Sequence, residues 1–151
     1  MLKLSKKTDY AIILLAHLGG QIDPVSAQEV ASIYKLPYPM VANILKQLVS
    51  SGLIKSNRGQ NGGYVLGRSP DDINLSEIIR ITDNTFELVE CVHEEDSCKV
   101  YQCCPTSGPL IALHNKIQQF VEETTLANII EDTQSKNFRV ENSSYGTAHL
   151  S

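Results

Sequence analysis

The 151-residue sequence has no tryptophan, and it has no cysteine outside the fourteen positions from Cys91 to Cys104. The apolar run near its start, "AIILLAHLGG", is interrupted by a histidine and ends in two glycines. It is therefore much shorter than the roughly 20 apolar residues that a helix needs to span a bilayer. The sequence contains no internal repeat. These absences argue against a membrane protein, a repeat protein and a fold held together by dispersed disulfides.

The first residues, "MLKLSKKTDY", are positively charged and precede that apolar run, which imitates a secretory signal peptide. Asp9 separates the lysines from the run, His17 interrupts it, and no small-x-small cleavage site follows. We therefore expect a cytoplasmic protein without a membrane partner. Thiols stay reduced there, so clustered cysteines are expected to be ligands or redox groups.

The cysteine segment, "CVHEEDSCKVYQCC", lacks the C-x-x-C pair that is typical of zinc knuckles and of thiol–disulfide enzymes. It also lacks a basic group beside the thiols, as a reactive nucleophile would need, and acids at 94–96 disfavour thiolates in the empty loop. We therefore do not expect an enzyme or a small-molecule substrate. Loosely spaced thiols in a loop fit an iron–sulfur cluster, of the 2Fe–2S or 4Fe–4S type.

Two other uses of this segment stay open. A thiol–disulfide switch needs only two of the cysteines, and a structural zinc could take three of them with His93 or His114. Adjacent cysteines cannot easily bind one small cluster together, so we expect either Cys103 or Cys104 to be a spare thiol.

Charge is distributed unevenly along the chain. Residues 1–68 carry eight Lys and Arg against three Asp and Glu, a net of +5, while residues 69–151 carry five against fourteen, a net of −9. The total of −4 hides a basic half that can approach a polyanion. Net acidity therefore does not exclude nucleic-acid binding.

The expected elements follow the order of a winged helix-turn-helix. Ser5 and Ser26 have the positions of helix caps, and Pro37 and Pro39 favour another helix start. The pieces "LIKSNR" and "GYVLGR" flank "GQNGG", which predicts a hairpin, and "DDINLSEIIRITD" predicts a helix capped by Asn74 or Asp72. The fold class is therefore mainly α with a small β-hairpin wing, divided into a DNA-binding domain (1–83), a cysteine-rich loop (84–108), a long dimerisation helix region (109–132) and a disordered tail (133–151).

Apolar residues three and four positions apart give each long helix one apolar face. For the helix near 109–124, this face is either a dimer interface or packs within the same chain. The faces predicted for the helices near 5–18, 37–51 and 109–124 are formed in turn by Tyr10, Ile13, Leu14 and Leu18; by Val41, Ile44, Leu45 and Leu48; and by Leu110, Leu113, Ile117, Phe120 and Val121.

DNA contacts are expected from three places. The second helix of a helix-turn-helix enters the major groove with its first turns, and an asparagine there can pair with adenine through two hydrogen bonds. An arginine at a glycine-rich hairpin tip is attracted by the minor groove. One such helix per chain favours a homodimer on a palindromic double-stranded operator. The candidates are Tyr38, Pro39, Met40, Ala42, Asn43, Lys46 and Gln47 on the helix, Arg58, Gln60, Asn61 and Gly62 on the hairpin, and Lys6, Lys7 and Thr8 for phosphates.

Three motifs in combination, "LSKKTDYA", "RGQNGGYVL" and a cysteine loop followed by a long helix ending in "TLANI", resemble the Rrf2 family of bacterial winged-helix regulators. The resemblance covers about residues 2–131. The opening "MLKLSKKTDYA" and the six-residue gap in "CVHEEDSC" look most like the branch that regulates SUF iron–sulfur assembly operons. The resemblance implies a cluster-sensing transcriptional repressor of such genes, with a nitric-oxide or redox sensor of the same fold as the alternative.

The resemblance also implies site residues. The family's cluster ligands fall on Cys91, Cys98 and Cys104, which leaves Cys103 as the spare thiol. A histidine that serves IscR-type members is replaced here by Ser107. An aspartate that completes the site from the partner subunit in NsrR-type members corresponds to Asp9, which we prefer as fourth ligand over His114, His93 and Cys103.

The family's DNA-contacting positions can be carried over in the same way. Its wing arginine falls on Arg58. Its recognition-helix contacts, which are Ser, Tyr, Glu and Gln in IscR-type members, fall on Pro39, Met40, Ala42 and Asn43. This chain is therefore expected to read a different operator.

Overall fold

The computed structural model describes residues 3–83, 87–88 and 99–135, and within them the chain forms six α-helices and one two-stranded hairpin. The predicted mainly α fold with a hairpin wing is confirmed. Cys91, Cys98 and residues 136–151 of the expected tail lie outside the described residues. The elements are α1 (Lys6–Gly19), α2 (Ala27–Ile33), α3 (Tyr38–Ser50), β1 (Ile54–Asn57), β2 (Gly63–Leu66), the short 3-10 helix η1 (Pro70–Asp72), α4 (Leu75–Asp83), η3 (Tyr101–Cys103), α5 (Ser107–Glu123) and α6 (Leu126–Ser135).

Helices α1, α2 and α4 begin at side-chain caps. In each, the cap oxygen accepts the backbone N–H of the residue three positions further on, at 3.1 Å for Ser5 and Ser26 and at 2.8 Å for Asn74. Such caps satisfy backbone donors that a helix start would otherwise leave unpaired. Of the two caps considered for α4, Asn74 is therefore the one used.

The turn of the helix-turn-helix lies between the end of α2 at Ile33 and the start of α3 at Tyr38. Lys35 has a positive φ of 53°, which an α-helix cannot contain. The next residue turns back, and the Leu36 N–H donates to the Ala31 carbonyl at 2.9 Å. Pro37 is extended, with φ −61° and ψ 119°, and precedes the first residue of α3.

The core is built from one face of each helix and from the base of the hairpin. In α3, the four predicted positions are all buried. In α1 the prediction is partly wrong, because Tyr10 and Ile13 are only half-buried and flank the true interior face. That face consists of Thr8, Ala11, Leu14, Leu15 and Leu18.

Helices α5 and α6 are separated by a break at Thr124–Thr125, inside the long helix region (109–132) that the sequence predicts. Two backbone hydrogen bonds, both 2.8 Å long, join this break to the start of α4: Leu75 N–H to Thr124 O, and Leu126 N–H to Ile73 O. The extended pairing takes the chain out of helical geometry. Leu126, which is fully buried, then begins α6.

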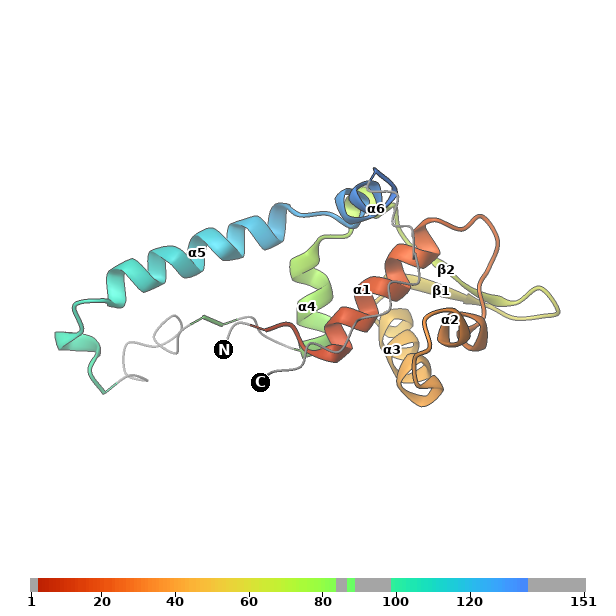
Figure 1. Cartoon of the computed structure of the whole chain (residues 1–151), viewed down its shortest axis with the longest axis horizontal. Coiled ribbons are helices and arrows are strands. Elements are labelled where there is room, and N and C mark those ends of the chain that lie inside the picture. The colour runs from red at the N-terminus through yellow and green to blue at the C-terminus, as the bar shows by residue number, and fades with distance from the viewer. Residues whose placement is uncertain (1–2, 84–86, 89–98, 136–151) are drawn as a thin grey trace, which may run out of the picture.

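The break also sets the shape of the molecule. Figure 1 shows a compact body of α1–α4, α6 and the hairpin, from which α5 projects as a single arm that ends in η3. Here we call this helix the α5 arm. None of the helices within the described ranges combines the length and apolar character needed to cross a membrane.

A polar network of Ser5, Thr8, Thr82 and Asp83 joins the start of α1 to the end of α4. The hydroxyls of Ser5 and Thr8 donate to the two carboxylate oxygens of Asp83, with 2.6 Å between Ser5 Oγ and Oδ1. Thr8 Oγ1 also lies 2.6 Å from Thr82 Oγ1. Burial favours the neutral acid, but the hydrogen bonds from Ser5 and Thr8 and the charge of Lys7 outweigh it and lower the pKa of Asp83.

The network makes a prediction about stability and pH. Because the pKa of Asp83 is lower in the folded chain, its contribution is present above about pH 4, the range of an unfolded aspartate, and is lost as the pH falls through the folded value. Asp83→Asn should lower the free energy of unfolding at pH 7 by about 1 kcal/mol, a modest value because the carboxylate is partly solvated. Urea unfolding at pH 7 and pH 3 measures the difference, which should shrink at pH 3.

The matched control is Asp72→Asn, which removes an exposed acid from η1. This variant should unfold like the parent chain at both pH values. Equal losses in the two variants, or a loss at Asp83 that does not depend on pH, would contradict the role given to the network.

Candidate functional site: DNA-binding surface and cysteine segment

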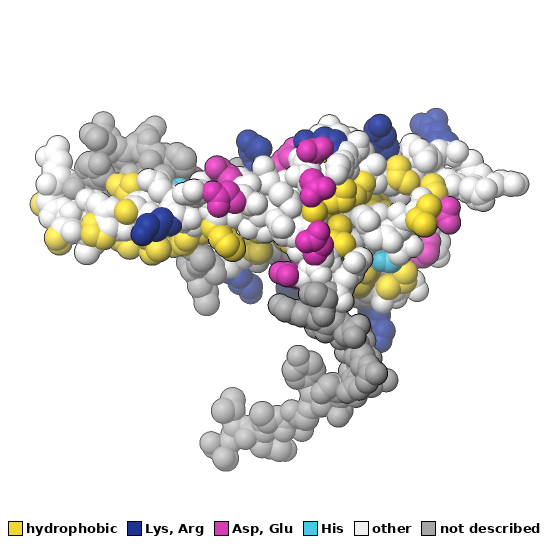
Figure 2. All heavy atoms as spheres, turned by 90° about the horizontal axis from the view of Figure 1, so that it is seen from above, with side chains coloured by type: hydrophobic (Ala, Val, Ile, Leu, Met, Phe, Trp, Pro, Cys, Tyr) yellow, Lys and Arg dark blue, Asp and Glu magenta, His cyan; other side chains and the backbone are white. Residues whose placement is uncertain are grey.

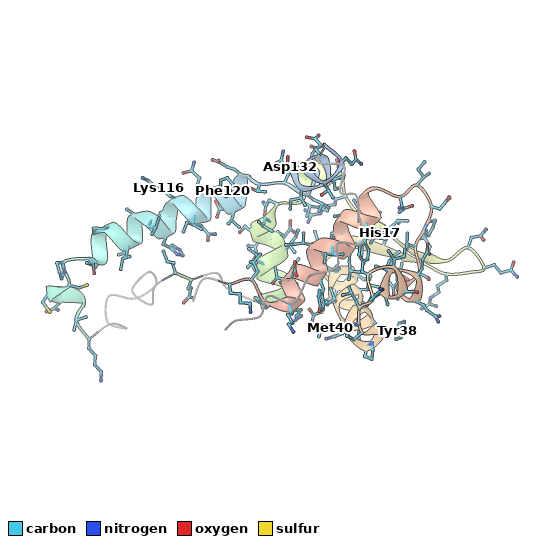
Figure 3. All side chains as sticks on the ribbon, viewed as in Figure 1. His17, Tyr38, Met40, Lys116, Phe120 and Asp132 are labelled. Carbon is cyan, nitrogen blue, oxygen red and sulfur yellow. The ribbon has the colours of Figure 1, made fainter. Side chains whose placement is uncertain are left out.

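The outward face of α3 carries most of the predicted base-reading residues. Tyr38 and Met40 are 53% and 38% exposed, and Asn43 and Lys46 are exposed as well. Figure 3 shows Tyr38 and Met40 on the same exposed end of the body. Ala42 is half-buried, and it offers only a methyl group. This part of α3 can therefore approach a DNA groove while its opposite face stays in the core.

The hairpin projects from the body as a wing, and its tip is exposed (Figure 1). Gly59 adopts a φ of +122°, a conformation that residues with a side chain rarely take. A Cβ at Gly62 would lie 2.6 Å from the Asn57 carbonyl oxygen, so the turn needs glycine there too. The turn presents Arg58, Gln60 and Asn61 to solvent.

The base of the wing is fixed to the body. Val25 and Tyr64 exchange two backbone hydrogen bonds, 2.8 and 3.1 Å long, so the loop between α1 and α2 adds a bridge to the hairpin. A Cβ at Gly63 would lie 2.7 Å from the Val25 carbonyl oxygen. The close approach explains a glycine at this point and holds the wing in one orientation relative to α3.

The first turn of α1 supplies two of the three phosphate-binding candidates. Lys6 is exposed and Lys7 is half-buried. Thr8 is fully buried, and its hydroxyl bonds to Asp83 and Thr82. A side chain in this position cannot reach DNA, so the expectation for Thr8 is corrected: the residue belongs to the polar network.

The two adjacent cysteines lie in different surroundings. Cys103 is exposed, and its thiol lies 3.5 Å from the Val100 carbonyl oxygen. Cys104 is half-buried, and its sulfur lies 3.3 Å from the Thr106 hydroxyl. That hydroxyl, with the backbone N–H groups of Thr106 and Ser107, lowers the pKa of Cys104 against the opposing effect of burial. Because metals bind the thiolate, Cys104 fits the role of a cluster ligand.

The remaining expected cysteine ligands, Cys91 and Cys98, lie outside the described residues. Among the residues that the structure describes, no three metal-binding side chains gather in one place. Ser107, where a histidine would serve in IscR-type members, donates its hydroxyl to the Cys104 carbonyl at 3.1 Å instead. It thus stabilises the turn that carries the thiol.

Asp9 and Cys104 are far apart within one chain. Asp9 is exposed in the first turn of α1, in the body. Cys104 lies beyond the far end of the α5 arm, whose 17 residues give a helix about 25 Å long (Figure 1). If these two groups hold the same cluster, Asp9 must come from a second subunit.

His114 has a structural position. Its ring is 5% exposed, and Nδ1 accepts the backbone N–H of Leu88 at 3.3 Å. A neutral ring that accepts at Nδ1 carries its proton on Nε2. His114 therefore holds the backbone at Leu88 against the α5 arm. The sequence, by contrast, offers this residue as a candidate metal ligand. His93 lies outside the described residues.

The α5 arm has an apolar edge that the described part of the chain leaves partly exposed. Phe120 is 68% exposed and Leu113 is 47% exposed, whereas Leu110 and Ile117 are half-buried. Their spacing of three and four residues places them along one edge, and Figure 2 shows apolar side chains lining an edge of the arm. Val121 is buried and is not part of this exposed edge. We call Leu110, Leu113, Ile117 and Phe120 the arm stripe.

Asp83 is the residue that sequence reasoning missed. Its partners, Ser5 and Thr8, are 78 and 75 residues away in the chain, so no local pattern connects them. One signal was present: an acid at the last residue of a helix is disfavoured by the helix dipole unless another group holds it. Here the start of α1 does so.

Comparisons with known proteins agree with this architecture. The profile of the Rrf2 family, described as iron-dependent transcriptional regulators, matches residues 4–132. The regulator NsrR of Shouchella clausii is 31% identical over 132 residues, which cover 85% of this chain and 89% of that protein. NsrR of Halalkalibacterium halodurans is 32% identical over 132 residues, or 85% and 90% of the two chains.

Solved structures give the same result. CymR of B. subtilis, described as its global cysteine regulator, superposes with a TM-score of 0.74 at 27% identity, over 88% of this chain and 99% of CymR. IscR of T. potens superposes with a TM-score of 0.71 at 26% identity, over 90% and 91% of the two chains. These relatives favour a position near NsrR and CymR over the SUF-specific branch that the opening sequence indicates. They are regulators and not enzymes, and the chain belongs to the Rrf2 family of winged-helix, DNA-binding transcriptional regulators.

Proposed function

We propose that this regulator is a repressor that senses nitric oxide or redox state through an iron–sulfur cluster. The cluster is held by Cys91, Cys98 and Cys104 of one subunit and by Asp9 of the partner subunit. The protein binds a palindromic operator as a homodimer.

The observation that carries this proposal is the placement of Asp9. It is an exposed carboxylate on the first turn of α1, at the position that serves NsrR-type members, and it is far from Cys104 of its own chain. A surface acid in a first helical turn is also explained by the helix dipole alone. The match to NsrR over 85% of the chain favours the ligand role.

The arm stripe supports the homodimer. Burying a large apolar side chain contributes about 1.5–3 kcal/mol, so exposed Leu113 and Phe120 favour a partner surface. A second α5 arm offers the same stripe, and paired helices commonly join at residues three and four apart. An antiparallel pairing of the two arms would bring each cysteine segment toward the body of the other subunit.

An iron–sulfur cluster, when bound, supplies a centre that reacts with nitric oxide and oxidants. The chain's own residues would relay its presence. Cys104 ties the arm to the first turn of α1 in the partner subunit, where Lys6 and Lys7 also lie. The expected coupling is a difference in DNA affinity of about 1–3 kcal/mol between cluster-loaded and cluster-free protein.

A second candidate function is control of iron–sulfur assembly genes through the same cluster. The opening "MLKLSKKTDYA" and the six-residue gap between Cys91 and Cys98 favour it. The two candidates differ in the signal. A sensor of assembly would respond to loss of the cluster under iron limitation, whereas a nitric-oxide sensor would respond to nitric oxide while iron is plentiful.

The first prediction concerns the cofactor. Protein purified without oxygen should be brown, should contain iron and sulfide, and should lose its visible absorption bands and its specific DNA binding on addition of a nitric-oxide donor. Asp9→Ala should weaken or bleach the visible spectrum because one ligand is lost. Absorption spectroscopy, iron analysis and DNA-binding titrations measure these outcomes.

Asp23→Ala is the control, since it removes another exposed acid from the same half of the chain. A colourless protein that contains zinc would indicate that the site holds a structural zinc ion and not a cluster. A protein with neither iron nor zinc would favour a thiol–disulfide switch. An unchanged spectrum in Asp9→Ala would remove Asp9 from the site.

The second prediction concerns the dimer. Phe120→Ser should weaken self-association by about 2–4 kcal/mol if the two side chains are buried against the partner, which is roughly 30- to 1000-fold in the dissociation constant. Sedimentation equilibrium measures it. Gln119→Ser, at the exposed position next to it, should leave the dimer unchanged. Equal association constants for both variants would place the dimer interface elsewhere.

A further inference from the structure

The first two turns of helix α3 lack the charged residue types that usually read G·C base pairs. Its sequence, "YPMVANILKQLVS", contains no arginine to pair with guanine and no carboxylate to accept from cytosine. Its single charge, Lys46, is in the third turn, and the base edges face the first turns of a recognition helix. What remains at the start of α3 is apolar surface and one short amide.

The spacing of Met40, Asn43 and Gln47 puts these three side chains next to each other along one flank of α3. Met40 is 38% exposed and Asn43 is exposed. Gln47 is different, because its amide oxygen is shielded from solvent and has no hydrogen-bond partner among the described residues. Asn43 is therefore the amide that can reach a base edge, and Met40 is its apolar neighbour.

The chemistry of these two side chains matches an A·T pair and its neighbour. An asparagine amide donates to adenine N7 and accepts from adenine N6. A flexible thioether side chain fits against the C5-methyl group of thymine, which is the apolar feature of the major groove. We infer that each operator half-site contains, side by side, an adenine read by Asn43 and a thymine whose methyl group packs on Met40.

This inference rests on the proposed function only in that α3 enters the major groove of a specific operator. It goes further by naming the base pairs and the atoms that are read. The operator is first obtained by selecting double-stranded sequences from a random pool with the full-length dimer. The selected half-sites should contain A·T pairs at the positions that Met40 and Asn43 protect.

The decisive probe is replacement of thymine by uracil, which removes only the methyl group. At one position in each half-site, this change should weaken binding about fourfold per half-site, as expected for one buried methyl group. Met40→Ala should bind the thymine operator with a similarly reduced affinity relative to the parent protein. This variant should no longer distinguish thymine from uracil. Met40→Leu, which keeps an apolar side chain, should still distinguish them.

Asn43 is tested at the neighbouring pair. Replacing its adenine by 7-deazaadenine should weaken DNA binding by the parent protein. Asn43→Ala should bind the parent operator between about fivefold and 100-fold more weakly, and its affinity should no longer depend on that replacement. Uracil at positions outside the contacted pairs is the control and should be silent.

Selected half-sites with G·C pairs at the contacted positions would overturn the inference while leaving operator binding in place. It would also be overturned if uracil at every position leaves the affinity unchanged, or if Met40→Ala still loses as much affinity on uracil substitution as the parent protein does. Failure to select any sequence would overturn both this inference and the DNA-binding half of the proposed function.

Discussion

The structure depends on the short extended pairing between the start of α4 and the break at Thr124–Thr125. Two backbone hydrogen bonds and the buried side chain of Leu126 fix the point at which the α5 arm leaves the body. Helix α6 returns to pack on α1, while the α5 arm projects from its base and contacts the chain near Leu88 through His114. The arm stripe and the cysteine turn are thereby both presented outward, where a second subunit can meet them.

The polar network provides the complementary fixed point at the start of α1. Asp83 is the last residue of α4, and the chain continues from it toward the cysteine segment. Its carboxylate accepts hydrogen bonds from the hydroxyls of Ser5 and Thr8, so the turn that carries Lys6, Lys7 and Asp9 is tied to the end of α4. The basic half of the chain and the acidic half are thus joined here by hydrogen bonds.

Local signals in the sequence predict the local structure well. The caps at Ser5 and Ser26, the buried face of α3 and the glycine-rich wing follow from patterns within a few residues. Long-range contacts could not be predicted in this way. The burial of Thr8 depends on Asp83, and the break before α6 depends on pairing with residues near 74. The position of His114 likewise depends on Leu88, 26 residues away.

The central claim is that one cluster site is assembled from two subunits, with thiols from one and Asp9 from the other. Co-expression of an Asp9→Ala chain with a Cys104→Ser chain, each with a different affinity tag, tests it most directly. Neither variant alone should hold a normal cluster, whereas the mixed dimer should regain about one complete site, with iron and sulfide to match. Mixed dimers as poor in iron as the two parent variants would contradict the claim.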